Sequence, residues 1–473
     1  MTECNGEQLE FHGLGRRAVV ARFDGGAIST DGGALLLREV EAKTGLLRAI
    51  AEQFTDHRDP ALIEHTVGEL VAQRILGLAL GYADLNDHDR LRFDPLLAVA
   101  AGKHDPTGER RRREQDRGKA LASSSTLNRL ELTPAHANAE ARYKKIVADQ
   151  AGLDRVLVEQ FIASHDRPPK ALWLDLDATD DPLHGHQEGR FFHGYYGHYC
   201  YLPLYITSGE HVLCARLRPS NIDAAAGSVD ELTRIVARLR AAWPTVRLII
   251  RGDSGFCRED IMAWCEAEGI EFVLGLAKND RLNARSLRWR IQAQQAFLDT
   301  GAPSRVFGEL TYRTLKTWSR ARRVVVKAEH LAKGANPRYV VTSLNPDEAD
   351  ARTLYEELYC ARGDMENRIK EQQLELFADR TSTQTMRANQ LRLTLSTFAY
   401  TLLVALRRLG LQDTELARAT PGNIRIRLLK VGAQVRVSVR RVVVALSEAF
   451  PAQDVFIQAA RNLAARPARA CPS

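Results

Sequence analysis

Three acidic side chains stand in sequence surroundings that suit chemistry on a bound cation. Asp175 and Asp177 alternate in the apolar stretch ALWLDLDA, so both would face the same side of one strand. Asp253 follows the apolar run VRLII at the carboxyl edge of a second predicted strand. Neighbouring carboxylates repel each other and lose hydration on burial, so they persist where a cation or solvent neutralises them. A turn-forming aspartate is the alternative for Asp253.

A third candidate group lies in the segment YCARGDMENRIKEQQ. Its residues Tyr359, Arg362, Glu366 and Lys370 stand at positions i, i+3, i+7 and i+11. This spacing puts all four on one face of a helix. The tyrosine and the arginine could grip a phosphate, the glutamate could bind a metal, and the lysine offers a further cation. A solvated, salt-bridged helix face is the alternative.

Two aspartates and a glutamate from separate elements form the oxygen-rich ligand set that Mg²⁺ prefers. Two such ions about 3.5–4 Å apart can activate a water or a 3′-hydroxyl group and stabilise the leaving oxygen of a phosphodiester. The predicted cofactor is therefore Mg²⁺, with two ions expected and Mn²⁺ able to take its place.

The elements that must position these groups follow a mixed α/β pattern after residue 168. A helix predicted at 227–244 would cross over and bring the strands of Asp177 and Asp253 side by side. Three β-rich stretches within 300–345 predict a β insertion, at about 280–346. A long helix at 347–376 and a hydrophobic helix at 389–406 are predicted after it. The other predicted strands are 198–207, 211–219 and 270–277.

The flanking regions point to DNA. Residues 1–165 are predicted to form a mainly helical DNA-binding domain, in which LASSSTLNRLE resembles the turn and start of a recognition helix. A plain polar turn is the alternative. Residues 401–473 contain eleven Arg and one Lys against two Asp and two Glu, an excess of eight positive charges. Within them, residues 423–446 alternate Arg with Ile or Val and predict a β-hairpin with one basic face. Nucleic acid is the usual partner of such regions, and a solubilising surface is the alternative.

The bulk properties fit a chain of two or three domains. It has 473 residues, of which 45% are hydrophobic and 26% are charged, and a net charge of +7. No charge-free apolar run is long enough to span a bilayer, and the first residues lack the layout of a signal peptide, so a cytoplasmic location is expected. The seven cysteines are scattered without a C-x-x-C pair, which argues against a zinc ribbon or a disulfide framework.

The order LDATD, RGDSGF and then Y-x2-R-x3-E resembles the DDE-type transposases of bacterial insertion sequences, most closely the subgroup with a Y-R-E-K signature. The resemblance covers roughly residues 170–400. It implies a ribonuclease H-like catalytic domain at 166–400 with a β-rich insertion, followed by a basic C-terminal region of β-hairpin and helix at 401–473. It also implies that catalysis and metal binding depend on three carboxylates, Asp177, Asp253 and Glu366.

The rest of the signature is carried over in part. Tyr359 and Arg362 match it, and together with Lys370 they would bind DNA phosphate. The family's final lysine stands seven residues after the glutamate, where this chain has Gln373. Lys370, one turn after Glu366, is the nearest substitute.

The resemblance implies a DNA transposase that cuts at the ends of its own element and joins them to target DNA, by hydrolysis followed by transesterification. Its partners would be the element's terminal inverted repeats and target DNA, held by a homodimer at the bacterial nucleoid. Members of the group also stack an aromatic side chain of the insertion on a displaced base, which makes Trp318 a candidate. A tryptophan packed in the core is the alternative.

Two other functions remain open at this point. The D-L-D-A-T motif also fits the first motif of haloacid dehalogenase-type phosphatases, with Asp175 as nucleophile and Asp177 as acid/base. That chemistry needs a lysine ahead of an acidic pair, whereas Lys278 follows Asp253 and Cys257 stands where the second acid belongs. A non-catalytic DNA-binding protein derived from a transposase is the second alternative.

Overall fold

The computed structural model describes residues 8–465, and their contacts divide the chain into two compact units. The first unit contains the residues up to Asp149, the short segment Glu375–Phe377 and the residues from Phe398 onward. The second contains Gln150–Leu374 and Ala378–Thr397, and with them the predicted catalytic groups. Both ends of the described range thus belong to one compact unit, and the functional division at residues 165 and 400 stays a prediction.

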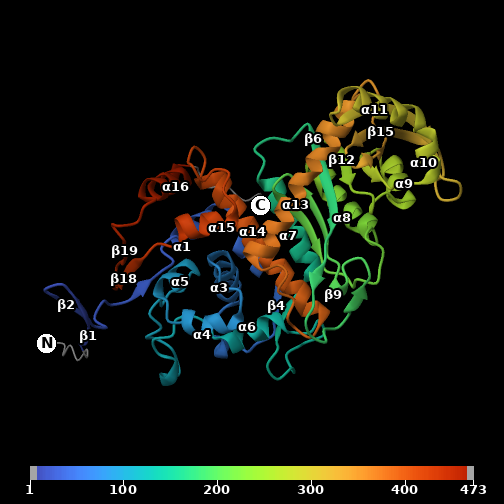
Figure 1. The fold of residues 1–473 in the computed structure, drawn as a ribbon. Helices are drawn as coiled ribbons and strands as arrows, with labels where there is room; N and C mark the ends of the chain where they lie inside the picture. The colour runs from blue at the N-terminus through green and yellow to red at the C-terminus, as the bar shows by residue number, and fades with distance from the viewer. Residues whose placement is uncertain (1–7, 466–473) are drawn as a thin grey trace. The chain divides into compact units, whose positions relative to one another are not determined.

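A nine-stranded mixed sheet forms the centre of the second unit (Figure 1). Its strand β6 runs parallel to β12 on one side and antiparallel to β10 on the other. The strand order is β11 (His211–Arg216), β10 (Leu204–Ser208), β6 (Ala171–Ala178), β12 (Arg247–Gly252), β13 (Glu271–Leu276), β17 (Arg338–Thr342), β15 (Arg322–Leu331) and β14 (Ser304–Tyr312), with β16 (Gly334–Ala335) on β15. The sheet confirms the predicted α/β class and the strands of the two predicted catalytic aspartates.

Helices pack on this sheet because its strands are apolar on both faces. The crossover helix α8 (Ser228–Ala242) buries Leu232, Ile235 and Leu239 at helical spacing and returns the chain so that β12 lies parallel to β6. The other helices of this unit are α7 (Gln150–Ala163), α9 (Glu259–Glu268), α10 (Asp280–Arg285), α11 (Leu287–Thr300), α12 (Ala351–Thr353), α13 (Gly363–Lys370) and the first half of α14 (Met386–Gly410).

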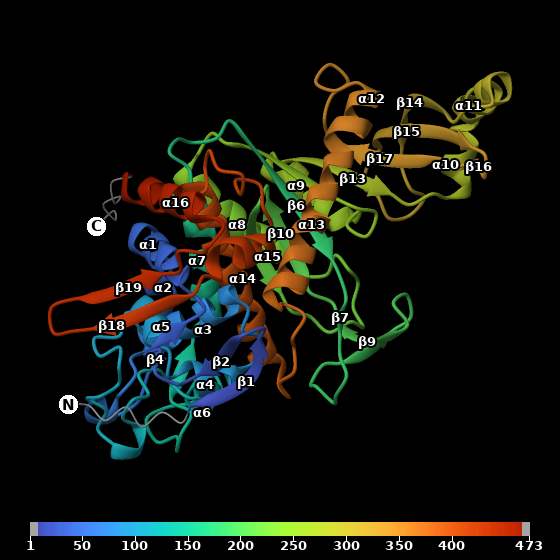
Figure 2. The ribbon, with the colours of Figure 1, turned by 60° about the vertical axis from the view of Figure 1, so that its left-hand side comes forward.

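The region predicted as a β insertion continues the central sheet. β17 pairs with β13, β15 with β17 and β14 with β15, all antiparallel. Neighbouring residues of β15, Val324 and Val325, are buried in core clusters on opposite faces of the sheet. Pairing here removes an exposed edge that β13 would otherwise present. Figure 2 shows α11 beside these added strands.

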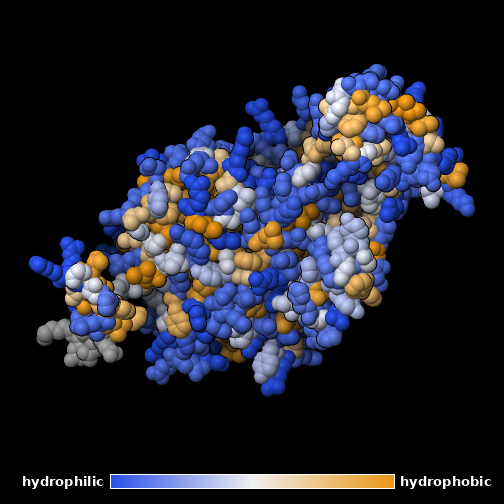
Figure 3. Space-filling model, in the orientation of Figure 1, coloured by the Kyte–Doolittle hydropathy of each residue, from blue (hydrophilic) through white to orange (hydrophobic). Residues whose placement is uncertain are grey.

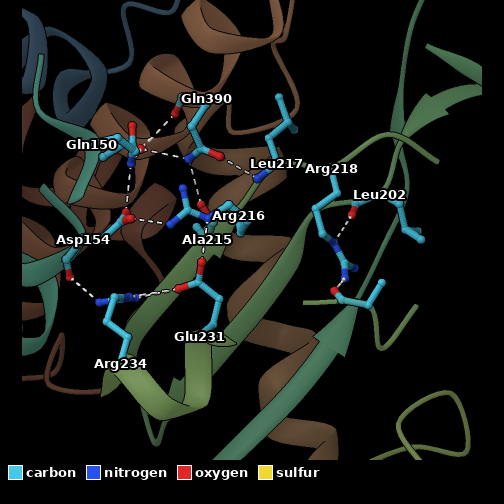
Figure 4. A network of polar contacts seen from close by, with 12 residues as sticks. Gln150, Asp154, Leu202, Ala215, Arg216, Leu217, Arg218, Glu231, Arg234 and Gln390 are labelled. Atoms are coloured by element: carbon cyan, nitrogen blue, oxygen red, sulfur yellow. Dashed lines mark hydrogen bonds and ion pairs between the residues drawn. The ribbon is translucent and has the colours of Figure 1, made fainter. Parts of the chain in front are cut away.

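A polar network ties the antiparallel edge of the sheet to its helices (Figure 4). Arg216 of β11 donates to Asp154 of α7 and, at 2.7 Å, to Glu231 of α8. Gln390 of α14 donates to the Ala215 carbonyl of β11 at 2.9 Å and accepts the Leu217 N–H just after this strand at 2.7 Å. Because three helices form hydrogen bonds with this edge of the sheet, the edge is fixed relative to the helices that pack on it.

A separate three-stranded sheet follows β6 directly. It consists of β7 (Asp181–Pro182), β9 (His198–Tyr201) and β8 (Phe191–His193), with β9 in the middle. All three strands are short, and β9 pairs antiparallel with both neighbours.

Helices make up most of the regular structure of the first unit. A capping box starts α3, in which the Thr66 hydroxyl accepts the Glu69 N–H at 3.2 Å and the Glu69 carboxylate accepts the Thr66 N–H at 2.8 Å. The helices are α1 (Ala34–Thr44), α2 (Leu46–Ala51), α3 (Val67–Leu80), α4 (His88–Leu91), α5 (Pro95–Ala100), α6 (Ser124–Glu131), α15 (Pro421–Ile424) and α16 (Gln453–Ala465). The strands are β1 (Leu9–Leu14), β2 (Arg17–Ala21), β3 (Ile28–Ser29), β4 (Phe54–Asp56), β5 (Ile146–Ala148), β18 (Ala433–Val437) and β19 (Val442–Leu446).

The β-hairpin predicted over 423–446 is wrong in its first half. Only β18 and β19 form it, around a turn in which the Ser438 N–H donates to the Arg441 carbonyl at 2.8 Å. The preceding residues are helical, as α15 and the π-helical segment Arg425–Leu429. Thr420 caps this helix and a proline occupies its first turn, two start signals that outweigh the alternation of Arg and Ile.

Hydrophilic side chains cover most of the molecular face in Figure 3, with hydrophobic residues scattered between them. Across residues 8–465, no helix is long and apolar enough to cross a membrane. The five cysteines in this range are free thiols, and Cys4 and Cys471 lie outside the described residues.

Candidate active site

The carboxyl ends of β6 and β12 bring two of the predicted aspartates together. Gly252 of β12 pairs with Leu176 of β6 in parallel register. Asp253 and Asp177 each follow directly after one of these paired residues, so they lie side by side at the strand ends. The Asp253 carboxylate accepts the Gly255 N–H at 2.8 Å, which fixes the turn after β12. Asp253 is therefore both a turn former and a neighbour of Asp177.

Asp175 has a different partner. Arg251 donates to its two carboxylate oxygens at 2.5 and 2.8 Å, and both side chains are buried. The same guanidinium donates to the Leu358 carbonyl at 2.5 Å and stacks 5.0 Å from the Trp173 ring. A carboxylate held in this way by arginine is not a free nucleophile, so the phosphatase alternative has no support at Asp175.

Arg251 is the important residue that the sequence reasoning missed. Its signal was available, because an arginine inside an apolar strand is rarely buried unless it is paired. In the parallel register Arg251 stands opposite Asp175. That register would have predicted the pair.

Arg362 links the third carboxylate to the first. Its guanidinium donates to Glu366 Oε1 at 2.8 Å and lies 3.7 Å from Asp177 Oδ2. Burial opposes its charge, but the nearby carboxylates, including Asp253, outweigh burial and raise the pKa of Arg362. The three predicted carboxylates thus surround one arginine.

Electrostatics at Asp177 reflect this crowding. Burial raises its pKa to about 6; Arg362 opposes that rise, while the charges of Asp253 and Glu366 add to it. A cation at this place would favour the ionised form of Asp177.

The helix that carries Glu366 is not the single regular helix predicted at 347–376. After α12 it passes through the π-helical segment Leu354–Tyr359 and the 3₁₀ turn Cys360–Arg362 before α13 begins, and a second π-helical segment, Glu371–Glu375, follows. The Arg251 bond to the Leu358 carbonyl falls within the first of these segments. π-Helical turns inside helices are frequent at functional sites.

Tyr359 is held close to the strand ends by a glycine. A Cβ atom on Gly275 of β13 would lie 2.5 Å from the Tyr359 hydroxyl and 3.0 Å from the Ser254 nitrogen. Only glycine permits this approach, so β13 helps to set the position of the tyrosine.

The sequence matches the family described as transposase DDE domain group 1 over residues 11–468. The chain belongs to the DDE transposase family. The protein is therefore a DNA transposase, an enzyme of a family that generally uses divalent metal ions. The transposase also has a structural similarity to a piggyBac transposase synaptic complex with hairpin DNA, at 10% identity and a TM-score of 0.36, over 85% of this chain and 80% of that one. No curated protein matches the sequence.

Gln373 stands where the resemblance to the Y-R-E-K subgroup would place a lysine. Its Nε2 donates to the Asp180 carbonyl at 3.0 Å. Lys370 is exposed on α13. The amide at 373 thus joins the glutamate helix to the loop after β6, a structural contact in place of a charge.

Trp318 lies in the core of the second unit with 5% of its surface exposed. Its ring packs edge-to-face on Tyr312 at 5.7 Å and lies 5.4 Å from the Arg322 guanidinium. The ring faces protein, which agrees with the packing alternative.

The donor set of the transposase suits a divalent ion. Asp177, Asp253 and Glu366 offer hard oxygen ligands, and their mutual repulsion would fall on binding a cation. In the described part of the chain, no three His, Cys, Asp or Glu residues already stand at metal-holding geometry. Arg362 is the cation among these carboxylates, so a metal ion would have to displace it.

Proposed function

We propose that Asp177, Asp253 and Glu366 are the catalytic carboxylates of this transposase and bind Mg²⁺, with two ions expected and Mn²⁺ able to replace it. The observation that carries the proposal is the meeting of the β6 and β12 ends, with Glu366 joined to Asp177 through Arg362. The bound ions would supply charge and an activated nucleophile for phosphodiester hydrolysis and strand transfer.

The protein side chains have separate tasks in this proposal. Arg362 neutralises Asp177 and Glu366 until metal and DNA arrive, and then contacts the phosphate that approaches them. Tyr359 and Lys370 add a hydroxyl and an ammonium donor on the same side. Asp175 and Arg251 position these groups without touching the DNA.

The strand arrangement supports a ribonuclease H-like core. On one side of β6, β10 pairs antiparallel with β6 and β11 pairs antiparallel with β10; on the other side, β12 and β13 continue parallel to β6. The strands β14, β15 and β17 extend this core beyond β13.

The proposed substrates are the terminal inverted repeats of a bacterial insertion sequence and its target DNA, held by a homodimer because two ends must meet. Two features of the first unit suit DNA binding. Asn128 and Arg129 of α6 line an open hollow together with Tyr143, with donors for phosphates and base edges. The β18–β19 turn exposes Arg440 and Arg441.

A cleavage assay tests the carboxylate assignment. Asp253→Asn and Glu366→Gln should each abolish Mg²⁺-dependent cleavage of a labelled DNA end, while mobility-shift binding of that end persists. Glu357→Gln is the matched control, because Glu357 is an exposed acid of the same helical region. Cleavage that survives either carboxylate change would refute the assignment.

A further inference from the structure

Arg218 follows β11 and is a buried arginine to which no acid is bonded. Only 6% of its surface is exposed. Asp223 and Glu231 attract its charge through space, but their carboxylates bond to other arginines. Arginine is rarely buried unless it is paired, because a charge loses its hydration there. Burial accordingly lowers the pKa of Arg218 to about 10, so its position needs an explanation in the contacts that it makes.

The hydrogen bonds of Arg218 go to backbone carbonyl groups. Its Nε donates to the Leu202 carbonyl at 2.9 Å (Figure 4), and its Nη1 donates to the Ala224 and Ala226 carbonyls at 3.0 and 2.6 Å. Among the described residues, the buried Nη2 has no hydrogen-bond partner. Because the guanidinium is planar and rigid, these bonds fix the 219–227 loop, which lies between β11 and α8, against the chain just before β10.

The 219–227 loop packs on the turn that carries Asp253. A Cβ atom placed on Gly255 would lie 3.6 Å from the Ala224 Cβ and 3.0 Å from Asp253 Oδ1. The Gly255 N–H also donates to the Asp253 carboxylate at 2.8 Å. Ala224 is one of the residues whose carbonyl accepts from Arg218, so two short backbone segments connect the guanidinium to the carboxylate of Asp253.

An ion pair ties the loop to this turn a second time. The Asp223 carboxylate accepts from Arg258 at 2.8 and 3.2 Å. Arg258 Nη1 donates in turn to the Ser254 carbonyl at 3.4 Å. The loop thus contacts both of the residues that follow Asp253.

We propose that Arg218 is a positioning residue for the metal site: by holding the 219–227 loop against the turn, it fixes the direction of the Asp253 carboxylate. The proposal rests on the assignment of Asp253 as a metal ligand above. Removing a partner that orients a metal ligand typically lowers metal affinity or activity by about 10- to 100-fold. A purely structural role is the alternative, and it predicts a lower stability with an unchanged metal affinity of the folded protein.

Mn²⁺ calorimetry on the full-length protein tests this role. Arg218→Met keeps a long side chain but removes its hydrogen bonds, and it should weaken Mn²⁺ binding by about 10- to 100-fold. In single-turnover cleavage, the Mg²⁺ concentration for the half-maximal rate should rise. The rate at saturating Mg²⁺ should change less, because the three carboxylates remain. Binding of a labelled DNA end in EDTA should stay at the wild-type level, because the side chain of Arg218 is buried.

Two further variants complete the test. Arg258→Met cuts the second tie from the surface, where its side chain is 39% exposed, and it should also weaken Mn²⁺ binding. Its result decides the question if near-UV circular dichroism shows that Arg218→Met does not fold. Arg240→Met is the matched control, because Arg240 also pairs with an acid but lies in the last turn of α8, at the end away from the loop. It should change neither metal binding nor DNA binding.

The proposal is overturned if folded Arg218→Met binds Mn²⁺ with wild-type affinity, whatever its unfolding midpoint in urea. Asp253→Asn separates this proposal from the carboxylate assignment, because it should lose both cleavage and Mn²⁺ affinity. Retained cleavage by Asp253→Asn would refute the assignment itself. A loss in Asp253→Asn beside wild-type affinity in Arg218→Met would refute the positioning role alone.

Discussion

Removing the charge of Asp175 should destabilise the second unit strongly, although Asp175 is not one of the three proposed catalytic carboxylates. The side chains of Asp175 and Arg251 are only 6% and 9% exposed, and two hydrogen bonds join them. Burial raises the pKa of Asp175 even though Arg251 lowers it, so the carboxylate is costly to ionise and depends on its partner. Asp175→Asn leaves the guanidinium buried without a counter-charge.

Breaking a buried pair from one side typically costs about 3–5 kcal/mol. Arg251 keeps its bond to the Leu358 carbonyl and its contact with Trp173, which argues for the lower end, a loss of about 3 kcal/mol in the free energy of unfolding. Urea unfolding followed by tryptophan fluorescence measures this loss. A loss below about 1 kcal/mol would mean that Arg251 is not an isolated buried charge after the change, and the reasoning would fail.

A double variant separates stability from positioning. Asp175→Leu/Arg251→Met replaces the ion pair with apolar side chains and should recover most of the lost stability. It cannot restore the bond to the Leu358 carbonyl, so the helix leading to Glu366 loses a fixed contact. We therefore expect single-turnover cleavage to stay slow and Mn²⁺ binding by calorimetry to weaken, while the unfolding curve returns toward wild type. Wild-type cleavage by this variant would show that Arg251 does not position the helix.

Three further outcomes follow from particular side chains. Trp318→Ala should cost about 3–5 kcal/mol in urea unfolding because the ring is buried, and a stable variant with weakened DNA-end binding would instead favour the stacking role. Gln373→Lys should steepen the salt dependence of end binding by about one phosphate contact, because lysine adds a positive charge; an unchanged slope in binding titrations would place this side chain away from the DNA. Burial lowers the pKa of His88 from 6.5 to about 3. Because the unfolded chain takes up a proton here at higher pH than the folded chain does, the contribution of neutral His88 to the free energy of unfolding is complete above pH 6.5 and is lost as the pH falls toward 3. Between about pH 7.5 and about pH 5.5 the wild type should lose about 1.4 kcal/mol more than His88→Asn, and equal losses in urea titrations would contradict the shift.

The sequence alone predicts the structure correctly where a local residue pattern and a rule of strand pairing agree. The apolar alternation around Asp177 and the apolar run before Asp253 predict two strands, and a crossover helix between them predicts that their ends meet. The register confirms this meeting. The family resemblance pointed to Glu366 over many intervening residues, and the bond through Arg362 connects it to the same place.

Prediction failed where a regular pattern competes with signals of another element. The alternation of Arg and Ile after Asn423 is typical of a strand, yet Thr420 and Pro421 start a helix there. Leu428 and Leu429 then become its buried residues. Alternation of polar and apolar residues in a short segment does not decide between strand and helix, because the tertiary structure determines which of the apolar side chains are buried.

The boundary of the insertion could not be read from the sequence for a different reason. Whether β17 joins β13 depends on pairing between segments that are 60 or more residues apart, and no local propensity encodes that choice. The π-helical turns before and after α13 are equally invisible, because they arise where outside contacts such as the Leu358 carbonyl bond compete with the helix.

The replacement at Gln373 connects these observations. A lysine there would supply charge to the DNA, whereas the amide bonds the Asp180 carbonyl and so attaches the glutamate helix to the loop after β6. A charge missing at this position has to come from another donor near the carboxylates, and Arg362 is the donor that lies between Asp177 and Glu366. The salt dependence of Gln373→Lys therefore tests whether a charge at position 373 adds a phosphate contact, or whether Arg362 already supplies the charge that the DNA end needs.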